Sequence, residues 1–244
     1  MTRVIVHADS GNRPRFHLPW NYHLSLQSFV YDAVGKYEPE LASELHQLKH
    51  APPFSFSEFI QTGPFQTDDD GINFERGYLV FSTPDDRIAN SIANFARADN
   101  ELTVGHTTIP VVGVEADSVS SESGRDTFKT LSPIASSKTD EDRTWIMPDD
   151  SMWRTRIRNN VRDRIEYTQG LHDGFEFRVP HIDWVEKKWL RVSSEYNVPC
   201  ARMEFDVVAD AETKKFFELN GIGEKTGMGF GSVMRTEDIP SWWS

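Results

Sequence analysis

One histidine and one tyrosine carry side chains suited to acid–base chemistry. His46 lies in a predicted helix whose apolar stripe is Leu41, Leu45 and Leu48, and at 100° per residue it points away from that stripe. A histidine suits a general base or acid because its ordinary pKa, about 6.5, is close to working pH. Tyr31 is also displaced from the apolar face of its helix, so its hydroxyl can orient a group or donate a proton. The alternative for both is structural: an ordinary exposed histidine, and a partly buried tyrosine whose hydroxyl reaches water.

Lys49 follows His46 by three residues, so the two side chains are expected on one side of the helix. A lysine there can stabilise the negative charge that grows on a phosphate. The alternative is a solvated lysine that the helix dipole favours near a C-terminus.

A glycine-rich segment at residues 221–231 reads Gly-Ile-Gly-Glu-Lys-Thr-Gly-Met-Gly-Phe-Gly. Glycine has no Cβ and adopts positive φ freely, so such a loop can turn several N–H groups toward one phosphate. It lacks the Gly-Lys-Ser/Thr ending of a P-loop. The candidate RNA-binding residues are Gly221, Gly223, Lys225, Gly229 and Gly231. The alternative is a glycine-rich hairpin turn.

Arginines are concentrated between residues 151 and 167, where a helix is predicted. Arg154, Arg158 and Arg162 have i, i+4 spacing and are expected to line one face. That face can follow a phosphate backbone. Equally, it can be a solvated face paired with neighbouring Asp and Glu side chains.

The composition limits the classes of function. Among 244 residues, 26 basic and 38 acidic side chains give a net charge of −12, which argues against bulk attraction to nucleic acid but not against a local basic patch. One cysteine, Cys200, excludes an intramolecular disulfide and a cysteine-cluster metal site. The sequence contains no metal-binding or cofactor-binding motif, so neither a bound metal ion nor a cofactor is expected. With no apolar run near ~20 residues and no signal sequence, a cytoplasmic location is expected.

Periodicity predicts an α+β fold made of two tandem ferredoxin-like (RRM-like) domains. In the first domain, residues 1–116, the predicted strands and helices run in the order β-α(α)-β-β-α-β, with a loop at 62–74. This domain carries the catalytic candidates. A polar linker covers 117–126. The second domain, 127–244, repeats the pattern with strands at 127–134, 175–179, 198–208 and 232–236, helices at 151–167 and 210–219, and the glycine loop.

Placed after the last helix of such a chain, the Gly-Ile-Gly-x5-Gly-Phe-Gly segment resembles the signature of the RAMP superfamily. Three further stretches, 18–22 with 29–33, 45–49 with 54–57, and 127–134, resemble the CRISPR-associated endoribonucleases that cut precursor guide RNA within its repeats, the Cas6 family. The resemblance spans nearly the whole chain.

The resemblance implies metal-independent cleavage by the RNA 2′-OH, leaving a 5′-OH and a 2′,3′-cyclic phosphate. His46 would be the general base or acid, Tyr31 would assist, and the glycine loop would hold phosphates. CRISPR repeat RNA or crRNA is the implied partner; effector-complex subunits and a homodimer are left open. A lysine that often follows the histidine by six residues in this family is absent, since position 52 is Pro52. The alternative is a non-catalytic guide-RNA-binding subunit of a CRISPR effector complex.

Overall fold

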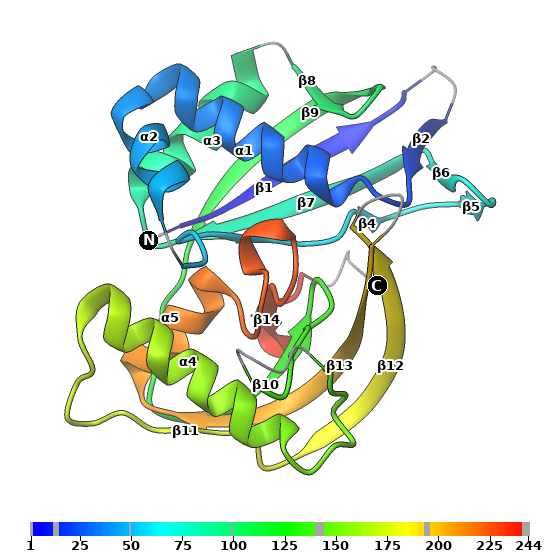
Figure 1. Ribbon diagram of the computed structural model, residues 1–244. Coiled ribbons are helices and arrows are strands. Elements are labelled where there is room, and N and C mark those ends of the chain that lie inside the picture. Colours follow the sequence, from blue (N-terminus) through cyan, green and yellow to red (C-terminus); the bar gives the residue numbers. More distant parts are fainter. Residues whose placement is uncertain are drawn as a thin grey trace.

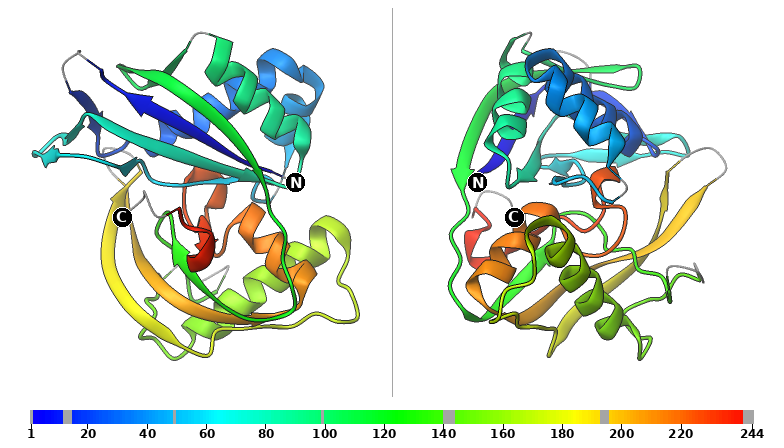
Figure 2. Two further views of the ribbon diagram at one scale, coloured as in Figure 1. Left: turned by 180° about the vertical axis from the view of Figure 1, so that it is seen from behind. Right: turned by 60° about the vertical axis from the view of Figure 1, so that its left-hand side comes forward.

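The computed structural model describes residues 2–11, 15–48, 50–98, 100–139, 144–192 and 196–240 (Figure 1). Within them, the chain forms two α+β units, each with helices on one face of an antiparallel sheet (Figure 2). The α+β class with two tandem ferredoxin-like domains, as predicted from the sequence, is confirmed.

The first unit is built on a sheet with the order β3-β7-β1-β9-β8. Its strands are β1 (Thr2–Asp9), β3 (Ser55–Phe56), β4 (Ile60–Gln61), β7 (Arg76–Thr83), β8 (Glu101–Val104) and β9 (Thr107–Ser118). Its helices are α1 (His23–Tyr37), α2 (Pro39–Gln47) and α3 (Asp86–Ala98). The apolar stripes of these helices are buried together with one face of the sheet in a single core cluster.

The second unit has the sheet order β11-β13-β10-β14, with β12 also paired to β13. Its strands are β10 (Gly124–Thr130), β11 (Phe177–Arg178), β12 (Ile182–Arg191), β13 (Asn197–Ala209) and β14 (Val233–Arg235). Its helices are α4 (Trp153–Gln169) and α5 (Ala211–Asn220), and the side chain of Asp210 caps α5 by accepting from the Thr213 N–H. Two 3-10 turns follow, η1 (Thr226–Met228) and η2 (Thr236–Asp238).

Two parts of the structure differ from the sequence prediction. The predicted loop at 62–74 was wrong: β5 (Phe65–Thr67) and β6 (Gly71–Phe74) join β2 (Phe16–Pro19) in a small three-stranded sheet. Strand β12, for which the sequence indicated no element, is one of the longest strands. Its alternation was obscured because Trp184, Val185 and Trp189 are all partly or largely exposed.

The two units share an apolar interface. Ile5, Tyr78 and Val80, on the helix-free face of the first sheet, pack against Leu131 and Met234 of the second unit in one buried cluster. This apolar burial is the favourable term that holds the two units together.

Ion pairs cross the same interface. Arg3 donates to Glu218 over 2.6 Å with both side chains buried, and Ser121 also donates to Glu218. Burial raises the pKa of the Glu218 carboxyl, while Arg3 and the Ser121 hydrogen bond act in the opposite direction. On another side, Arg202 of β13 pairs with the buried Glu58. The ion pairs therefore determine how the two units are aligned, while the apolar contacts hold them together.

The glycine segment 221–231 is the tightest part of this interface. A Cβ added at Gly227 would lie 2.3 Å from the Pro52 Cγ, and one at Gly229 would lie 2.4 Å from the Phe56 ring and 2.5 Å from the His23 Nδ1. At Gly231 it would lie 1.8 Å from the Ile222 carbonyl oxygen, at a φ of +67°. Glycine is required here because two backbone segments and the first unit meet without room for side chains.

Gly231→Ala is expected to lower the free energy of unfolding by about 3 kcal/mol, because it combines a left-handed φ with a clash against backbone. The matched control is Gly63→Ala, since nothing lies within 4 Å of a Cβ at Gly63. Chemical denaturation of both variants checks this. Equal unfolding midpoints for the two variants would contradict the role given to Gly231.

His23 makes the interface sensitive to acid. Neither ring nitrogen has a hydrogen-bond partner among the described residues, and burial lowers the pKa of His23 to about 4, aided by Lys188 and Arg202. Between pH 6.5 and about 4, the imidazole of residue 23 is therefore protonated in the unfolded chain but not in the folded chain. This contribution to stability is complete above pH 6.5 and is lost as the pH falls from 6.5 to about 4, a change of about 3 kcal/mol.

His23→Phe keeps an aromatic ring but removes the titrating group. Its unfolding free energy, measured by denaturation between pH 7.5 and 4, is expected to fall less with acid than that of the parent chain. His106→Phe, at an exposed hairpin position, is the control and should keep the parent's pH dependence. Identical pH profiles for His23→Phe and the parent would rule out this source of acid sensitivity.

Candidate functional site

The two catalytic candidates of the first unit are in contact. The rings of Tyr31 on α1 and His46 on α2 stack with centroids 4.5 Å apart and an interplanar angle of 17°. Phe54 meets the Tyr31 ring edge-on at 5.9 Å. His46 is exposed in the last turn of α2, whereas Tyr31 is half-buried against the core. Helices α1 and α2 therefore expose the His46 imidazole to solvent, and the partly buried Tyr31 ring stacks on it and holds it in place.

Burial raises the pKa of the Tyr31 hydroxyl above its ordinary value. The hydroxyl therefore stays protonated at neutral pH and can only donate or accept a hydrogen bond, not act as a phenolate. An imidazole beside a protonated phenol offers a group that can accept or donate a proton together with an O–H donor, which is the minimum that general acid–base chemistry needs.

The third catalytic candidate, Lys49, lies outside the described residues. Position 52 is occupied by the Pro52 ring, which packs directly on Gly227 of the glycine segment. No cation is therefore supplied from position 52, and the loop that follows α2 is held against the second unit instead.

The candidate RNA-binding glycines are buried, and several of their N–H groups are used inside the protein. Gly221 donates to Phe217, Gly229 to Thr226 and Gly231 to Pro133, each a backbone carbonyl. Gly223 is also buried, and a Cβ added there would lie 2.6 Å from the Ala135 carbonyl oxygen. These glycines thus have a packing role, which the sequence motif did not distinguish from a phosphate nest.

Lys225 is the cationic residue of this segment, and its backbone is left-handed with a φ of +59°. Its ammonium lies 5.5 Å from the centroid of the Tyr196 ring. Together with Glu224 it stands where the segment is only partly buried, so its side chain lines a cavity.

The arginines of α4 point in two directions. Arg154 and Arg158 are exposed, with Arg158 over the Phe175 ring, and Arg162 pairs with its neighbour Asp163. Arg162 is only partly exposed, so the predicted face is not uniformly open to a ligand.

Two other arginines of α4, which the sequence interpretation did not single out, point toward the glycine segment. Arg164 donates to the Asn220 and Gly221 carbonyls at 2.9 and 3.0 Å, and burial lowers its pKa to about 10. Arg156 donates to the Ser137 carbonyl at 3.0 Å. Each lies two residues away from a member of the predicted Arg154, Arg158 and Arg162 face. This spacing already indicated that they lie on another side of α4.

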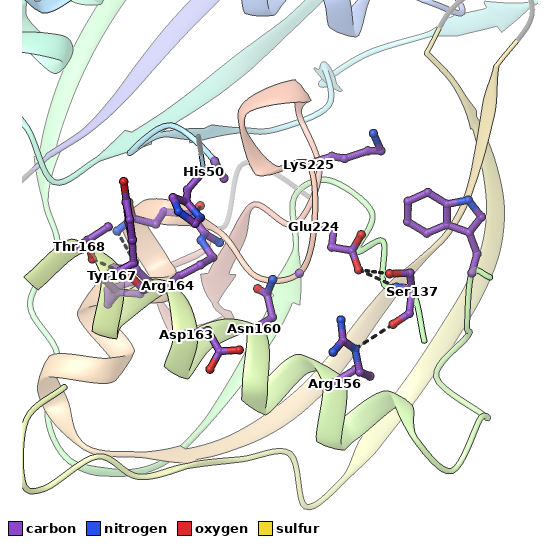
Figure 3. A pocket seen from close by; sticks show the side chains of 15 residues that line it. His50, Ser137, Arg156, Asn160, Asp163, Arg164, Tyr167, Thr168, Glu224 and Lys225 are labelled. Atoms are coloured by element: carbon purple, nitrogen blue, oxygen red, sulfur yellow. Dashed lines mark hydrogen bonds between the residues drawn. The ribbon is translucent and has the colours of Figure 1, made fainter. Parts of the chain in front are cut away.

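A cavity of about 460 Å³ lies between α4, the glycine segment and the residues that follow α2 (Figure 3). The ring of His50 meets the ring of Tyr167 on α4 with centroids 3.6 Å apart, so the two units touch at its edge. The site thus spans both units: an acid–base pair on the first, and a cavity with cationic and aromatic side chains at their junction.

The described part of the chain contains neither a cluster of metal ligands nor a membrane-spanning helix. It contains no group of three or more His, Cys, Asp or Glu side chains placed to hold a metal ion. No helix in the described ranges is both long and apolar enough to cross a membrane.

Family models match both halves of the chain. Residues 17–114 match the model "CRISPR-associated protein Cas6, N-terminal", and residues 115–234 match "CRISPR associated protein Cas6, C-terminal".

Similar proteins cover the chain almost from end to end. CRISPR-associated endoribonuclease Cas6 1 of Methanocaldococcus jannaschii is 27% identical over 230 residues, covering 91% of this chain and 88% of that protein. CRISPR-associated endoribonuclease Cas6 of Pyrococcus furiosus is 23% identical, covering 89% and 83%. An endoribonuclease-like protein named Cas6nc, from Pyrococcus horikoshii, is 27% identical, covering 90% and 94%.

Solved structures show the same fold. A RAMP protein described as binding different RNA substrates superimposes with a TM-score of 0.82 at 25% identity, covering 96% of this chain and 99% of that one. The product of a Cas6-related gene from Pyrococcus furiosus has a TM-score of 0.82 at 23% identity, covering 97% and 99%.

Arg164→Ala is expected to destabilise the chain by about 2 kcal/mol, because it removes two charge-assisted hydrogen bonds to the start of the glycine segment. Arg154→Ala, on the exposed side of the same helix, should change stability by less than about 0.5 kcal/mol. Thermal melting of the two variants checks this. A melting temperature for Arg164→Ala as high as that of Arg154→Ala would contradict it.

Proposed function

The chain belongs to the Cas6 family, since models of the family's two halves match residues 17–114 and 115–234, and on this premise we propose that it is an endoribonuclease that cuts precursor CRISPR RNA within its repeats. The similarity to two proteins named Cas6 endoribonucleases supports this activity. The single observation that carries it is the stacked Tyr31–His46 pair, which places an exposed imidazole beside a protonated phenol.

The proposed reaction uses the nucleophile that RNA itself carries. His46 accepts the proton of the 2′-OH as its oxygen attacks the adjacent phosphorus, and the bond from phosphorus to the 5′ oxygen breaks. The leaving 5′ oxygen takes a proton from the nearby Tyr31 O–H or from water, giving a 5′-OH and a 2′,3′-cyclic phosphate. Tyr31 supports the His46 ring and offers the nearby O–H donor. No metal ion takes part in this proposal.

The remaining sequence predictions fit this proposal as positioning roles. We propose that the first domain, 1–116, carries the acid–base pair, and that the second, 127–244, binds the RNA backbone. Arg154, Arg158 and Lys225 are the cations in reach of solvent that would contact phosphates, and Lys49 remains a candidate for charge stabilisation. Gly221, Gly223, Gly229 and Gly231 would act by shaping the domain junction. Effector-complex subunits and a homodimer stay predictions.

A non-catalytic RNA-binding role is the second candidate. It is favoured by the proline at position 52, where no lysine is available, and by the net charge of −12. In that case the chain would bind repeat RNA and leave it intact.

The two candidates are separated by incubating the full chain with its own CRISPR repeat RNA in excess EDTA. Cleavage is expected, and it should vanish when the nucleotide 5′ of the cut carries a 2′-deoxy sugar. Intact all-ribose RNA that is nevertheless bound would establish the non-catalytic role. Cleavage of the deoxy substrate would instead exclude attack by the 2′-OH.

Variants then test the residues. His46→Ala is expected to slow cleavage roughly 10²- to 10⁴-fold at unchanged RNA affinity, and Tyr31→Phe roughly 10²-fold. His106→Ala, an exposed histidine at a distant hairpin, is the control. Lys49→Ala measures the charge role of that residue. Full activity of His46→Ala in single-turnover assays would remove it from the mechanism.

A further inference from the structure

The cavity at the domain junction has the size and lining of a ligand site that the acid–base pair does not use. Its volume, about 460 Å³, falls in the range of small-molecule pockets, roughly 300–1,000 Å³. Figure 3 shows side chains from three places pointing into it: α4 below, the glycine segment above, and the residues after α2 at one end. The side chains that line the cavity indicate the chemistry of its ligand.

Aromatic rings form part of these walls. At one end, Tyr167 stands 55% exposed in contact with the ring of His50. Trp145 lines another part of the same cavity. Aromatic rings that border a polar cavity provide surfaces on which unstacked nucleobases stack, and such stacking is worth roughly 1–3 kcal/mol per base.

Two acceptor atoms that line the cavity, on Glu224 and Asn160, have unused hydrogen-bonding capacity. Glu224 accepts from the Ser137 N–H at 2.8 Å and from its hydroxyl at 2.6 Å, but both bonds end on Oε1. Within the described ranges, the structure shows no donor for the Glu224 Oε2. The Asn160 Oδ1, on α4, is also without a hydrogen-bond partner among the described residues. Two acceptors therefore border the cavity with capacity for a ligand's N–H groups.

The charge of the cavity suits an anionic ligand. Arg156, Arg164 and Lys225 line it against the carboxylates Asp163 and Glu224, so cations are in the majority in a chain whose net charge is −12. A phosphate attached to the base would lie near these cations. The combination of ring, cation and acceptor is that of a nucleotide site.

The acceptors select among the four bases. Guanine presents two neighbouring donors on its Watson–Crick edge, N1–H and the N2 amino group, whereas adenine and cytosine present one amino group and uracil one ring N–H. Two acceptors with unused capacity match guanine best. We propose that this cavity holds one unstacked guanine nucleotide of the RNA, with Glu224 and Asn160 accepting from its Watson–Crick edge. The proposal rests on the RNA-cleaving function proposed above and assigns it a specificity pocket.

The test measures binding of the full chain, carrying His46→Ala to prevent cleavage, to fluorescent heptauridylates. The central residue is guanosine, inosine or uridine. Inosine keeps the guanine ring system and O6 but lacks the N2 amino group. Guanosine is expected to bind roughly tenfold more tightly than inosine, as one good base-edge contact provides. Equal affinity for the guanosine and inosine oligomers overturns the proposal.

Variants locate the discrimination. Glu224→Gln can still accept from Ser137 but places an amide N–H₂ toward the base, so the guanosine preference is expected to shrink to less than twofold. Glu166→Gln, an exposed carboxylate on the same α4, should keep the tenfold preference. If melting shows that Glu224→Gln is unfolded, Asn160→Ala, a helix-compatible change, carries the same expectation. A preference retained in the folded variant overturns the assignment.

The result is independent of the cleavage assay. A guanosine preference without cleavage of repeat RNA would support the pocket and refute the nuclease. Cleavage without a guanosine preference would refute the pocket alone.

Discussion

The contact between the glycine segment and the first domain is the constraint on which the rest of the structure depends. Gly227 and Gly229 let the backbone of the second domain approach Pro52, Phe56 and His23 to distances that no Cβ would permit. This contact fixes the residues that follow α2, and so places the Tyr31–His46 pair and the ring of His50 relative to α4. A motif that suggests a phosphate loop is, in this chain, first of all a joint between domains.

Apolar and charged contacts have different roles at the interface between the domains. The cluster around Ile5, Val80 and Met234 supplies area removed from water, which is the non-directional part of the stabilisation. The buried Arg3–Glu218 pair adds little net stability, because desolvation offsets much of its attraction, but it admits only one alignment of the two domains. A site assembled from both domains needs that alignment more than it needs additional stability.

The sequence predicted the helices and the ferredoxin-like order, because periodicity encodes them, whereas the role of Tyr31 beside His46 was implied only by the family resemblance. It could not show β12, whose outward aromatics hide the alternation, or the small sheet made by β2, β5 and β6. Nor could it reveal that Arg156 and Arg164, rather than Arg158, face the cavity, since that depends on how α4 is rotated on its sheet. Position 52 shows the same limit. The sequence shows that proline stands there instead of lysine, but only the structure shows that the Pro52 ring packs against Gly227.

That last contact carries a consequence for the evolution of such chains. Because a Cβ at Gly227 would lie 2.3 Å from the Pro52 ring, positions 52 and 227 share one small volume, although 175 residues separate them. Substitutions at the two positions are therefore epistatic, and their effects on stability do not add. A long flexible side chain at position 52 would have to leave this volume and extend toward solvent, which changes both the packing of the joint and the charge near His46. The proline at position 52 is thus constrained as one member of a residue pair rather than as a single residue.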